Sequence, residues 1–283
     1  MGWSSLRVSP LTFLSCRCPP HESRIVLIGC PFDLTSSFRP GSRFAPSSIR
    51  QASWNLESFS PGLQRDLEGA PVADLGDLEL SGTPEKAIRE IEEAISEVVS
   101  AGKLPFLLGG EHLISLGAVR ALKAAYEGLT VLQVDAHADL RDQYLGAELS
   151  HATVMRRVVE ELGAERVFQV GVRSWAPEEW RWAKAKGTFL GEGPDTPIPR
   201  ELQEVPLYLT VDLDVLDPGV CPGVGTPEPG GWTFKELESF LGRLPFERIV
   251  GVDVVELSPP FDPSGVSSVV AAKVVRELLL SLL

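Results

Sequence analysis

Short apolar runs rich in β-branched residues alternate with amphipathic stretches from Arg24 to the end of the chain. Nearly continuous apolar runs are typical of strands buried on both faces of a parallel sheet, and the amphipathic stretches are typical of helices that cover it. The expected strands are residues 24–30, 104–108, 129–134, 166–170, 207–211 and 248–254. The expected helices are residues 84–100, 114–126, 152–162, 234–241 and 267–282. The pattern predicts an α/β fold with a central, mostly parallel sheet.

The length of 283 residues fits one large α/β domain. No internal repeat, low-complexity tract or long linker divides the chain, so we expect a single domain over residues 24–283. Residues 1–23 are expected to form an N-terminal extension whose structure the sequence leaves poorly defined. Two segments rich in Gly and Pro, residues 39–46 and 218–231, are expected to be long functional loops.

The net charge of −13 argues against nucleic acid or an anionic membrane as the main partner, because an acidic surface repels both. Bound cations or a cationic substrate fit this charge better, although an acidic surface also serves solubility alone. No apolar run approaches the roughly 20 residues of a membrane span. The four cysteines are too irregularly spaced for a disulfide framework, so we expect a cytoplasmic protein.

Three of the four histidines lie directly after an expected strand or in the loop that follows one. In an open parallel sheet, ligands bind at the carboxyl ends of the strands, so each strand end can deliver side chains to one crevice. The segments that carry such side chains are GGEH (109–112), DAHAD (135–139), SH (150–151) and DLDVLDP (212–218).

Ligand-type side chains occupy alternate positions at two of these strand ends. Asp135, His137 and Asp139 share one side if the extended backbone persists, and Asp212 and Asp214 repeat the arrangement. Carboxylates packed this closely repel one another unless a cation neutralises them. Each alone is more often a structural hydrogen-bonding residue, so the interpretation depends on their joint placement. Oxygen and nitrogen ligands without thiolate suit ions such as Mn²⁺. Two ions sharing bridging carboxylates use all six candidates: His112, Asp135, His137, Asp139, Asp212 and Asp214.

The ordered segments GGEH, VDAHADLRD, SHATVMRR, TVDLDVLDP, GVGTPEPGG and DVVELSP resemble the motifs of the ureohydrolase family of arginases and agmatinases. PFDLTSSFRPGSRFAPSSIRQAS, residues 31–53, is similar to the N-terminal segment of that family. The resemblance runs from about Arg24 to the C-terminus. It implies a three-layer α/β/α sandwich, in agreement with the strand and helix pattern.

The resemblance also implies two manganese ions and a role for each site residue. His112, Asp135, Asp139 and Asp212 would hold one ion, and Asp135, His137, Asp212 and Asp214 the other. Asp135 and Asp212 would then be the bridging ligands. His151 would move protons together with Asp139, Glu256 would bind the guanidinium group, and Thr226 would line the pocket.

The implied reaction is attack of a metal-activated hydroxide on a guanidinium carbon, which releases urea and a primary amine. In arginases the loop after D-x-H-x-D carries Asn and Ser groups that read the α-carboxylate and α-amine, whereas here it reads LRDQYLGAELS, with Arg141 where the family has an asparagine. This departure resembles agmatinases, so agmatine or a longer alkylguanidine of polyamine synthesis is the first expectation. Arginine is the second, because Arg141 could pair with a carboxylate, and guanidino acids and formiminoglutamate remain open. The family's usual assemblies imply a trimer or hexamer.

Two other classes of function use similar residues. A binuclear phosphoesterase would need basic side chains or a Gly-rich helix start around the metals, whereas these loops are acidic. A metal-binding relative without catalysis would be expected to have lost ligands, whereas all six are present. Both alternatives are therefore less favoured than a ureohydrolase.

Overall fold

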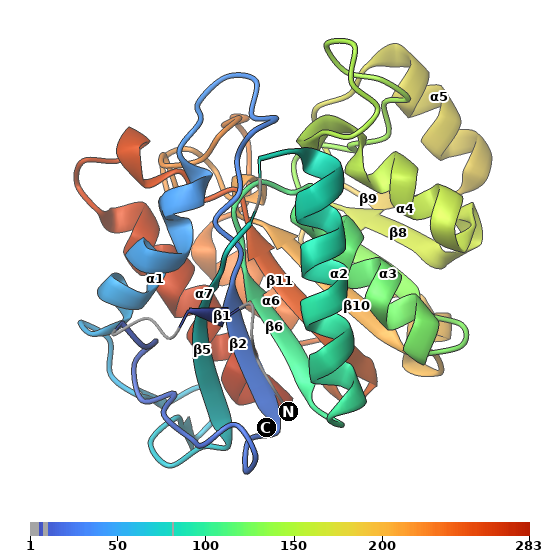
Figure 1. Cartoon of the computed structure of the whole chain (residues 1–283). Helices are drawn as coiled ribbons and strands as arrows, with labels where there is room; N and C mark the ends of the chain where they lie inside the picture. Colours follow the sequence, from blue (N-terminus) through green and yellow to red (C-terminus); the bar gives the residue numbers. More distant parts are fainter. Residues whose placement is uncertain (1–5, 8–10, 81) are drawn as a thin grey trace.

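A nine-stranded sheet forms the centre of the computed structural model, which describes residues 6–7, 11–80 and 82–283 (Figure 1). The strand order is β1-β5-β2-β6-β11-β10-β7-β8-β9, and each neighbouring pair is parallel except β1 with β5. The strands are β1 (Leu6–Arg7), β2 (Ile25–Gly29), β5 (Val72–Leu78), β6 (Leu104–Leu108), β7 (Thr130–Val134), β8 (Val167–Val170), β9 (Phe189–Gly191), β10 (Leu207–Asp212) and β11 (Ile249–Val255). A separate small sheet pairs β3 (Phe59–Ser60) with β4 (Arg65–Asp66).

Helices cover both faces of the sheet and give the expected three-layer α/β/α sandwich. Side chains alternate along each strand, so Ile25 and Leu27 pack on one face and Val26 and Ile28 on the other. One apolar layer lies under α1 (Ala45–Ser53), α6 (Phe234–Leu241) and α7 (Val266–Leu282). The other lies under α2 (Pro84–Ser100), α3 (Ile114–Ala125), α4 (Val154–Leu162) and α5 (Pro177–Lys186).

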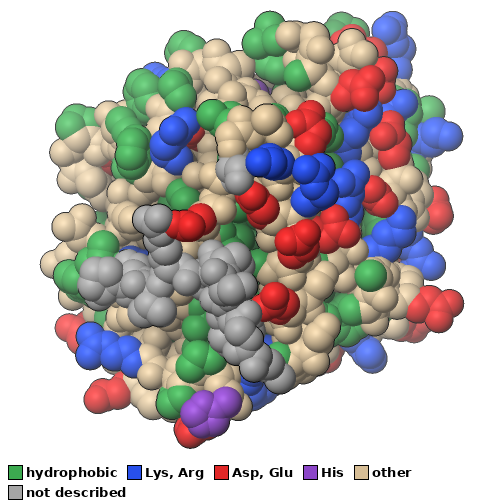
Figure 2. Space-filling model, in the orientation of Figure 1, with side chains coloured by type: hydrophobic (Ala, Val, Ile, Leu, Met, Phe, Trp, Pro, Cys, Tyr) green, Lys and Arg blue, Asp and Glu red, His purple; other side chains and the backbone are tan. Residues whose placement is uncertain are grey.

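Helix α2 illustrates how the sequence produces these elements. The Thr83 hydroxyl accepts a hydrogen bond from the Lys86 amide, and Pro84 occupies the first helical position, where no amide donor is needed. Ile88, Ile91 and Ile95 recur at helical spacing and are buried against the sheet. The opposite face carries interspersed acidic and basic side chains, which Figure 2 shows in the region of α2.

All six expected strands and all five expected helices form, with boundaries that differ by at most two residues. The prediction of a loop over residues 39–46 is wrong at its C-terminal end, since Ser42–Phe44 form a 3-10 turn and α1 begins at Ala45. Pro46 explains this start, because proline is favoured in the first turn of a helix. Residues 218–231 contain no helix or strand, as predicted.

The described residues before β2 pack on the sheet rather than away from it. Phe13 is fully buried, Cys16 lies in the same apolar layer, and Arg17 forms a bridge with Ala73 of β5. No described helix is both long enough and apolar enough to cross a membrane.

The topology brings four neighbouring strand ends together. β6, β11, β10 and β7 are consecutive in the sheet and parallel, so their carboxyl ends open on the same edge, at the top of Figure 1. Each of these four strands is followed directly by a segment that contains a candidate site residue. This edge is therefore where the site is built.

Candidate metal centre and active site

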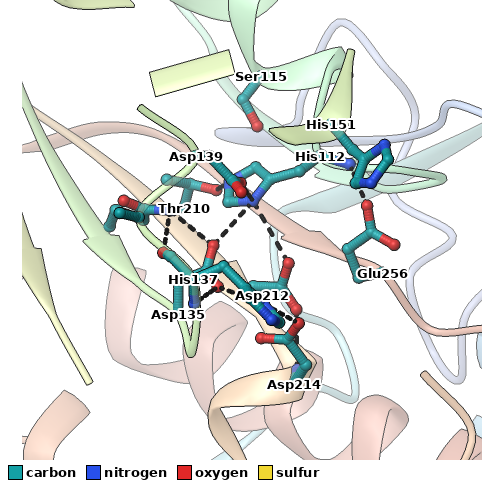
Figure 3. Close-up of polar contacts among 12 residues, drawn as sticks. His112, Ser115, Asp135, His137, Asp139, His151, Thr210, Asp212, Asp214 and Glu256 are labelled. Atoms are coloured by element: carbon teal, nitrogen blue, oxygen red, sulfur yellow. Dashed lines mark hydrogen bonds and ion pairs between the residues drawn. The ribbon is translucent and has the colours of Figure 1, made fainter. Parts of the chain in front are cut away.

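His112 reaches the carboxylates from the turn after β6. The turn passes very close to another segment, because a Cβ on Gly110 would lie 1.9 Å from the Phe32 carbonyl oxygen, so only glycine fits there. His112 is fully buried. Its Nδ1 atom lies 3.0 Å from Asp135 Oδ2, 3.2 Å from Asp139 Oδ2 and 3.3 Å from Asp212 Oδ2 (Figure 3).

A second group of ligand atoms shares Asp135 with the first. His137 Nδ1 lies 2.8 Å from Asp214 Oδ2 and 3.8 Å from Asp135 Oδ1. The ligand atoms of His112, Asp135 and Asp139 form one group suited to a metal ion, and those of Asp135, His137 and Asp214 form another. The structure thus brings together all six candidate ligands, with Asp135 between the two groups.

The backbone holds these carboxylates in place. The Ala136 amide donates to Asp214 Oδ1 at 3.1 Å and the His137 amide donates to Asp135 Oδ1 at 2.6 Å. The Asp214 amide donates to Asp212 Oδ1 at 2.8 Å, and the Gln133 side-chain amide donates to Asp135 Oδ2 at 2.6 Å. The acidic groups are therefore fixed before any ion binds, which lowers the entropy cost of binding.

The site holds more negative charge than it can stabilise alone. Burial, followed by the charges of Asp214 and Asp139, raises the pKa of Asp135 to about 7. Burial, with the charges of Asp214 and Asp135, also raises the pKa of Asp212 well above its usual range. A cation would reverse both shifts, because it stabilises the ionised carboxylates.

The hydrogen bonds of His112 test whether a cation fits. His112 Nε2 lies 2.8 Å from the Thr210 hydroxyl, which holds this side of the ring. His112 Nδ1 faces Asp135, Asp139 and Asp212, and among the described residues this buried atom has no hydrogen-bond partner. A metal ligand histidine has this arrangement, with one ring nitrogen held by a polar partner and the other free for the ion. The donor set fits a divalent cation.

Glu256 follows β11 and lies beside the cluster of candidate metal ligands (Figure 3). Its backbone has φ +65°, a left-handed conformation that costs a non-glycine residue about 1 kcal/mol or more. The Glu256 amide donates to the Gly110 carbonyl at 2.9 Å, and its Oε1 accepts from the His112 amide at 2.7 Å. A Cβ on Gly225 would lie 2.9 Å from Oε2, so the side chain depends on glycine there. Asp139 also has a left-handed backbone, with φ +53°.

His151 lies on the loop side of the site, just before α4. Its Nε2 is 3.2 Å from the Ser37 hydroxyl, and its Nδ1 is 3.4 Å from the Thr35 hydroxyl. The Tyr144 ring packs edge-on against the imidazole, with centroids 5.8 Å apart. Burial lowers the pKa of His151, so the ring is neutral at neutral pH.

A cavity of about 230 Å³ joins these residues. Its wall includes six of the expected ligands or catalytic groups, together with Thr226, whose hydroxyl donates to Asp214 Oδ2 at 3.2 Å. The cavity is also lined by Arg141, whose Nε lies 3.9 Å from Glu179 Oε2 and whose guanidinium stacks on the Tyr144 ring at 5.1 Å. Every substrate-binding residue expected from the sequence lines this cavity: Glu256, Thr226, Arg141 and His151.

Five residues of the site have no predicted role. Ser37, Tyr144, Trp175 and Glu179 line the cavity, and Glu111 anchors the loop that carries Thr35. Glu111 lies inside the GGEH motif, next to a predicted ligand, so the motif itself could have indicated it. Ser37 and Tyr144 lie in two segments that the sequence comparison with the family singles out, residues 31–53 and 140–150, but nothing in those segments distinguishes these two residues, and Trp175 and Glu179 lie in a segment without such a pattern.

The fold and site together are typical of a metal-dependent hydrolase, since buried carboxylates and histidines converge at the carboxyl edge of a parallel sheet. Residues 23–281 match the model of the arginase family. The chain belongs to the arginase family, and it is a hydrolase that acts on carbon–nitrogen bonds of guanidino compounds.

Known relatives are similar over most of the chain. An agmatinase from Bacillus anthracis is 43% identical over 267 residues, which are 92% of each chain. A guanidinobutyrase from Pseudomonas aeruginosa is 33% identical, with 89% of this chain and 84% of the relative covered. The crystal structure of the agmatine ureohydrolase of Thermoplasma volcanium superposes with a TM-score of 0.88 at 39% identity, covering 97% of this chain and 94% of that one.

Proposed function

We propose that the chain is an agmatinase-type ureohydrolase that uses two divalent metal ions, with manganese as the expected metal. The observation that carries this proposal is the pair of ligand groups that share Asp135, next to the buried carboxylate of Glu256. One ion would be held by His112, Asp135, Asp139 and Asp212, and the other by Asp135, His137, Asp212 and Asp214. Such ions supply a water that is activated for attack at neutral pH.

Glu256 would orient the substrate. Its Oε1 is committed to the His112 amide, so Oε2 is the oxygen that remains for a guanidinium N–H. Charge-assisted hydrogen bonds between guanidinium and carboxylate are strong and directional. Glu256 lines the cavity together with Asp139 and Thr226, so a guanidinium bound to Glu256 would lie beside the candidate metal ligands. This placement supports its proposed role as the substrate clamp.

His151 and Asp139 would move the protons that the reaction requires. Collapse of the tetrahedral intermediate expels an amine, which leaves only after it is protonated. Both side chains line the same cavity, and His151 is neutral in the resting site, so it can take up a proton and pass it to the leaving nitrogen. Asp139 Oδ2 lies 3.2 Å from His112 Nδ1, within the proposed metal site.

Agmatine is the proposed substrate, within polyamine synthesis. The similarity to agmatinases over nearly the whole chain supports it. Glu179 also lines the cavity, so the charge of Arg141 beside it does not leave this part of the wall purely cationic toward a distal ammonium. Residues 140–149 contain neither Asn nor Ser, and the Ser150 hydroxyl lies 3.3 Å from the Thr153 hydroxyl, so arginine would lose hydrogen-bond partners for its α-carboxylate on burial, at a cost of about 3 kcal/mol.

A guanidino acid is the second candidate, because Arg141 also lines the cavity and could pair with a carboxylate. The guanidinobutyrase relative supports this alternative. Arg141 already lies beside Glu179 and stacks on Tyr144, so its charge is partly compensated, which favours agmatine.

A comparison of substrates tests the proposal. Urea release is measured with manganese on agmatine, an N-alkylated agmatine, arginine and 4-guanidinobutyrate. We expect kcat/KM for agmatine to exceed that for arginine by about 100-fold, the equivalent of about 3 kcal/mol. Equal or faster turnover of arginine would exclude the agmatinase assignment, and preference for 4-guanidinobutyrate would establish the second candidate. A trimeric or hexameric assembly and a cytoplasmic location stay predictions.

A further inference from the structure

The segment after β2 is tied to the site by one buried carboxylate. Glu111 is fully buried, and its Oε2 accepts from the Thr35 amide at 2.9 Å and from the Ser36 hydroxyl at 3.3 Å. Its Oε1 accepts from the Thr35 hydroxyl. Thr35 and Glu111 are 76 positions apart in the sequence, so this contact fixes the loop against the turn that carries His112.

The same Thr35 hydroxyl also contacts two atoms of His151, the backbone amide and the ring Nδ1. It accepts from the His151 amide at 3.0 Å, and it lies 3.4 Å from His151 Nδ1. A threonine hydroxyl has one hydrogen to donate and two lone pairs to accept with. Its hydrogen is given to Glu111, so toward His151 Nδ1 the oxygen can only accept.

From this donor count we infer that Thr35 and Glu111 are positioning residues that hold His151 in the tautomer with its proton on Nδ1. The inference rests on the proposed proton-carrying role of His151 for its consequence in catalysis, but not for the tautomer itself. In this tautomer Nε2 is unprotonated and accepts from the Ser37 hydroxyl at 3.2 Å. Ser37 lines the cavity, so the basic nitrogen of the imidazole is the one that faces the substrate side.

This arrangement has a chemical purpose in the proposed reaction. A neutral imidazole can accept a proton only at its unprotonated nitrogen, so the tautomer decides which side of the ring is the base. With Nδ1–H directed to Thr35, a proton taken at Nε2 stays next to the cavity and the leaving amine. The opposite tautomer would place the base against the Thr35 and Glu111 side, away from the substrate.

Histidine tautomers can be read directly from two-bond ¹⁵N–¹H correlation spectra. The chain has only four histidines, so the signals of His151 can be assigned by their loss in His151→Asn. The measurement uses full-length protein loaded with Mg²⁺, which is diamagnetic, at pH 7.5. We expect the wild-type His151 to show a protonated Nδ1 and an unprotonated Nε2. A protonated Nε2 in the wild type would overturn the inference.

The substitution Glu111→Gln reverses the direction of the hydrogen bond between residue 111 and the Thr35 hydroxyl. The amide oxygen takes the place of Oε2, which must accept from the Thr35 amide, so the amide nitrogen donates to the Thr35 hydroxyl. The hydroxyl is then free to donate to His151 Nδ1, and we expect the tautomer to switch to Nε2–H. An unchanged tautomer in a folded variant would contradict the inference.

Kinetics then show whether the tautomer matters for turnover. We expect Thr35→Val to lower kcat at least tenfold while KM changes less than twofold, and Thr35→Ser to restore kcat to within threefold of the wild type. Ser36→Ala is the matched control, since it removes one hydrogen bond to Glu111 without touching His151, and it should leave kcat within twofold. Failure of the chain to release urea would refute the proposed function and leave the tautomer result standing. A wild-type kcat in Thr35→Val would refute the positioning role alone.

Discussion

Replacing Glu256 with glutamine removes one charge from the site and changes little else. The amide oxygen can take the place of Oε1, which accepts from the His112 amide at 2.7 Å, so the turn after β6 keeps its anchor. The amide nitrogen then replaces Oε2. A guanidinium N–H that would meet a carboxylate oxygen in the wild type meets another donor in Glu256→Gln.

The expected loss follows from that exchange. Removing one partner of a buried, hydrogen-bonded charge pair costs about 2 to 5 kcal/mol. At about 1.4 kcal/mol for each factor of ten, kcat/KM should fall between about 30-fold and several thousand-fold. Metal content should stay at the wild-type value, because no proposed ligand changes.

The assay is urea release from agmatine over a range of concentrations, with bound metal measured on the same samples. Glu238→Gln is a suitable control, since Glu238 lies on α6 and pairs with Lys235 at the surface, away from the site. It should retain wild-type kinetics. Unaltered kcat/KM in Glu256→Gln would show that Glu256 does not bind the guanidinium, and loss of metal in that variant would show that it acts through His112 instead.

Three further predictions concern the metal centre and the core. Asp212→Asn should lower kcat by at least a factor of 100 while the melting temperature of the metal-free protein stays the same or rises, since one buried charge is lost; near-normal turnover in manganese would exclude Asp212 as a bridging ligand. In the metal-free protein, the folded-state pKa is raised to about 7 for Asp135 and to about 10 for His137, so the folded state binds more protons than the unfolded state. Its melting temperature should therefore fall as the pH rises from about 5 to about 9, and a saturating divalent ion should remove this fall; a rise with pH would contradict the charge argument. Arg50→Met should lower the free energy of unfolding by about 3 to 5 kcal/mol, because it leaves Asp74 and Asp77 without their buried cation; denaturant unfolding that shows a loss below about 1 kcal/mol would refute this.

The sequence predicts the strands whose residues are almost all apolar and misses those that are not. β5 escapes detection because Asp74 and Asp77 interrupt its apolar run. Arg50 on α1, itself fully buried, binds Asp74 through Nε at 2.8 Å and makes such a strand possible. A pairing between a helix and a strand 24 residues further along is a tertiary contact that local pattern does not contain.

The missed helix α5 and the missed edge strand β9 also lack local patterns. α5 carries charged and aromatic residues around its circumference, and within it only Glu179 and Ala183 are buried. β9 has three residues, all half-buried, at the edge of the sheet. Neither shows the alternation or helical spacing from which an element can be predicted.

The candidate ligands are predictable because their chemistry is local in the sequence. Asp135, His137 and Asp139 alternate at the end of one strand, and the topology of a parallel sheet brings Asp212 beside them. The positions of Thr35 and Glu111 beside His151 are different. They depend on hydrogen bonds between segments that only the folded chain brings together.

Titration of metal-free protein with Mn²⁺ tests the central claim most directly, with bound metal and urea release from agmatine measured on the same samples. The account predicts that bound metal saturates at two ions per chain and that urea release reaches its maximum as the second ion binds. Folded protein that saturates with manganese and releases no urea from agmatine or any other guanidine would contradict it.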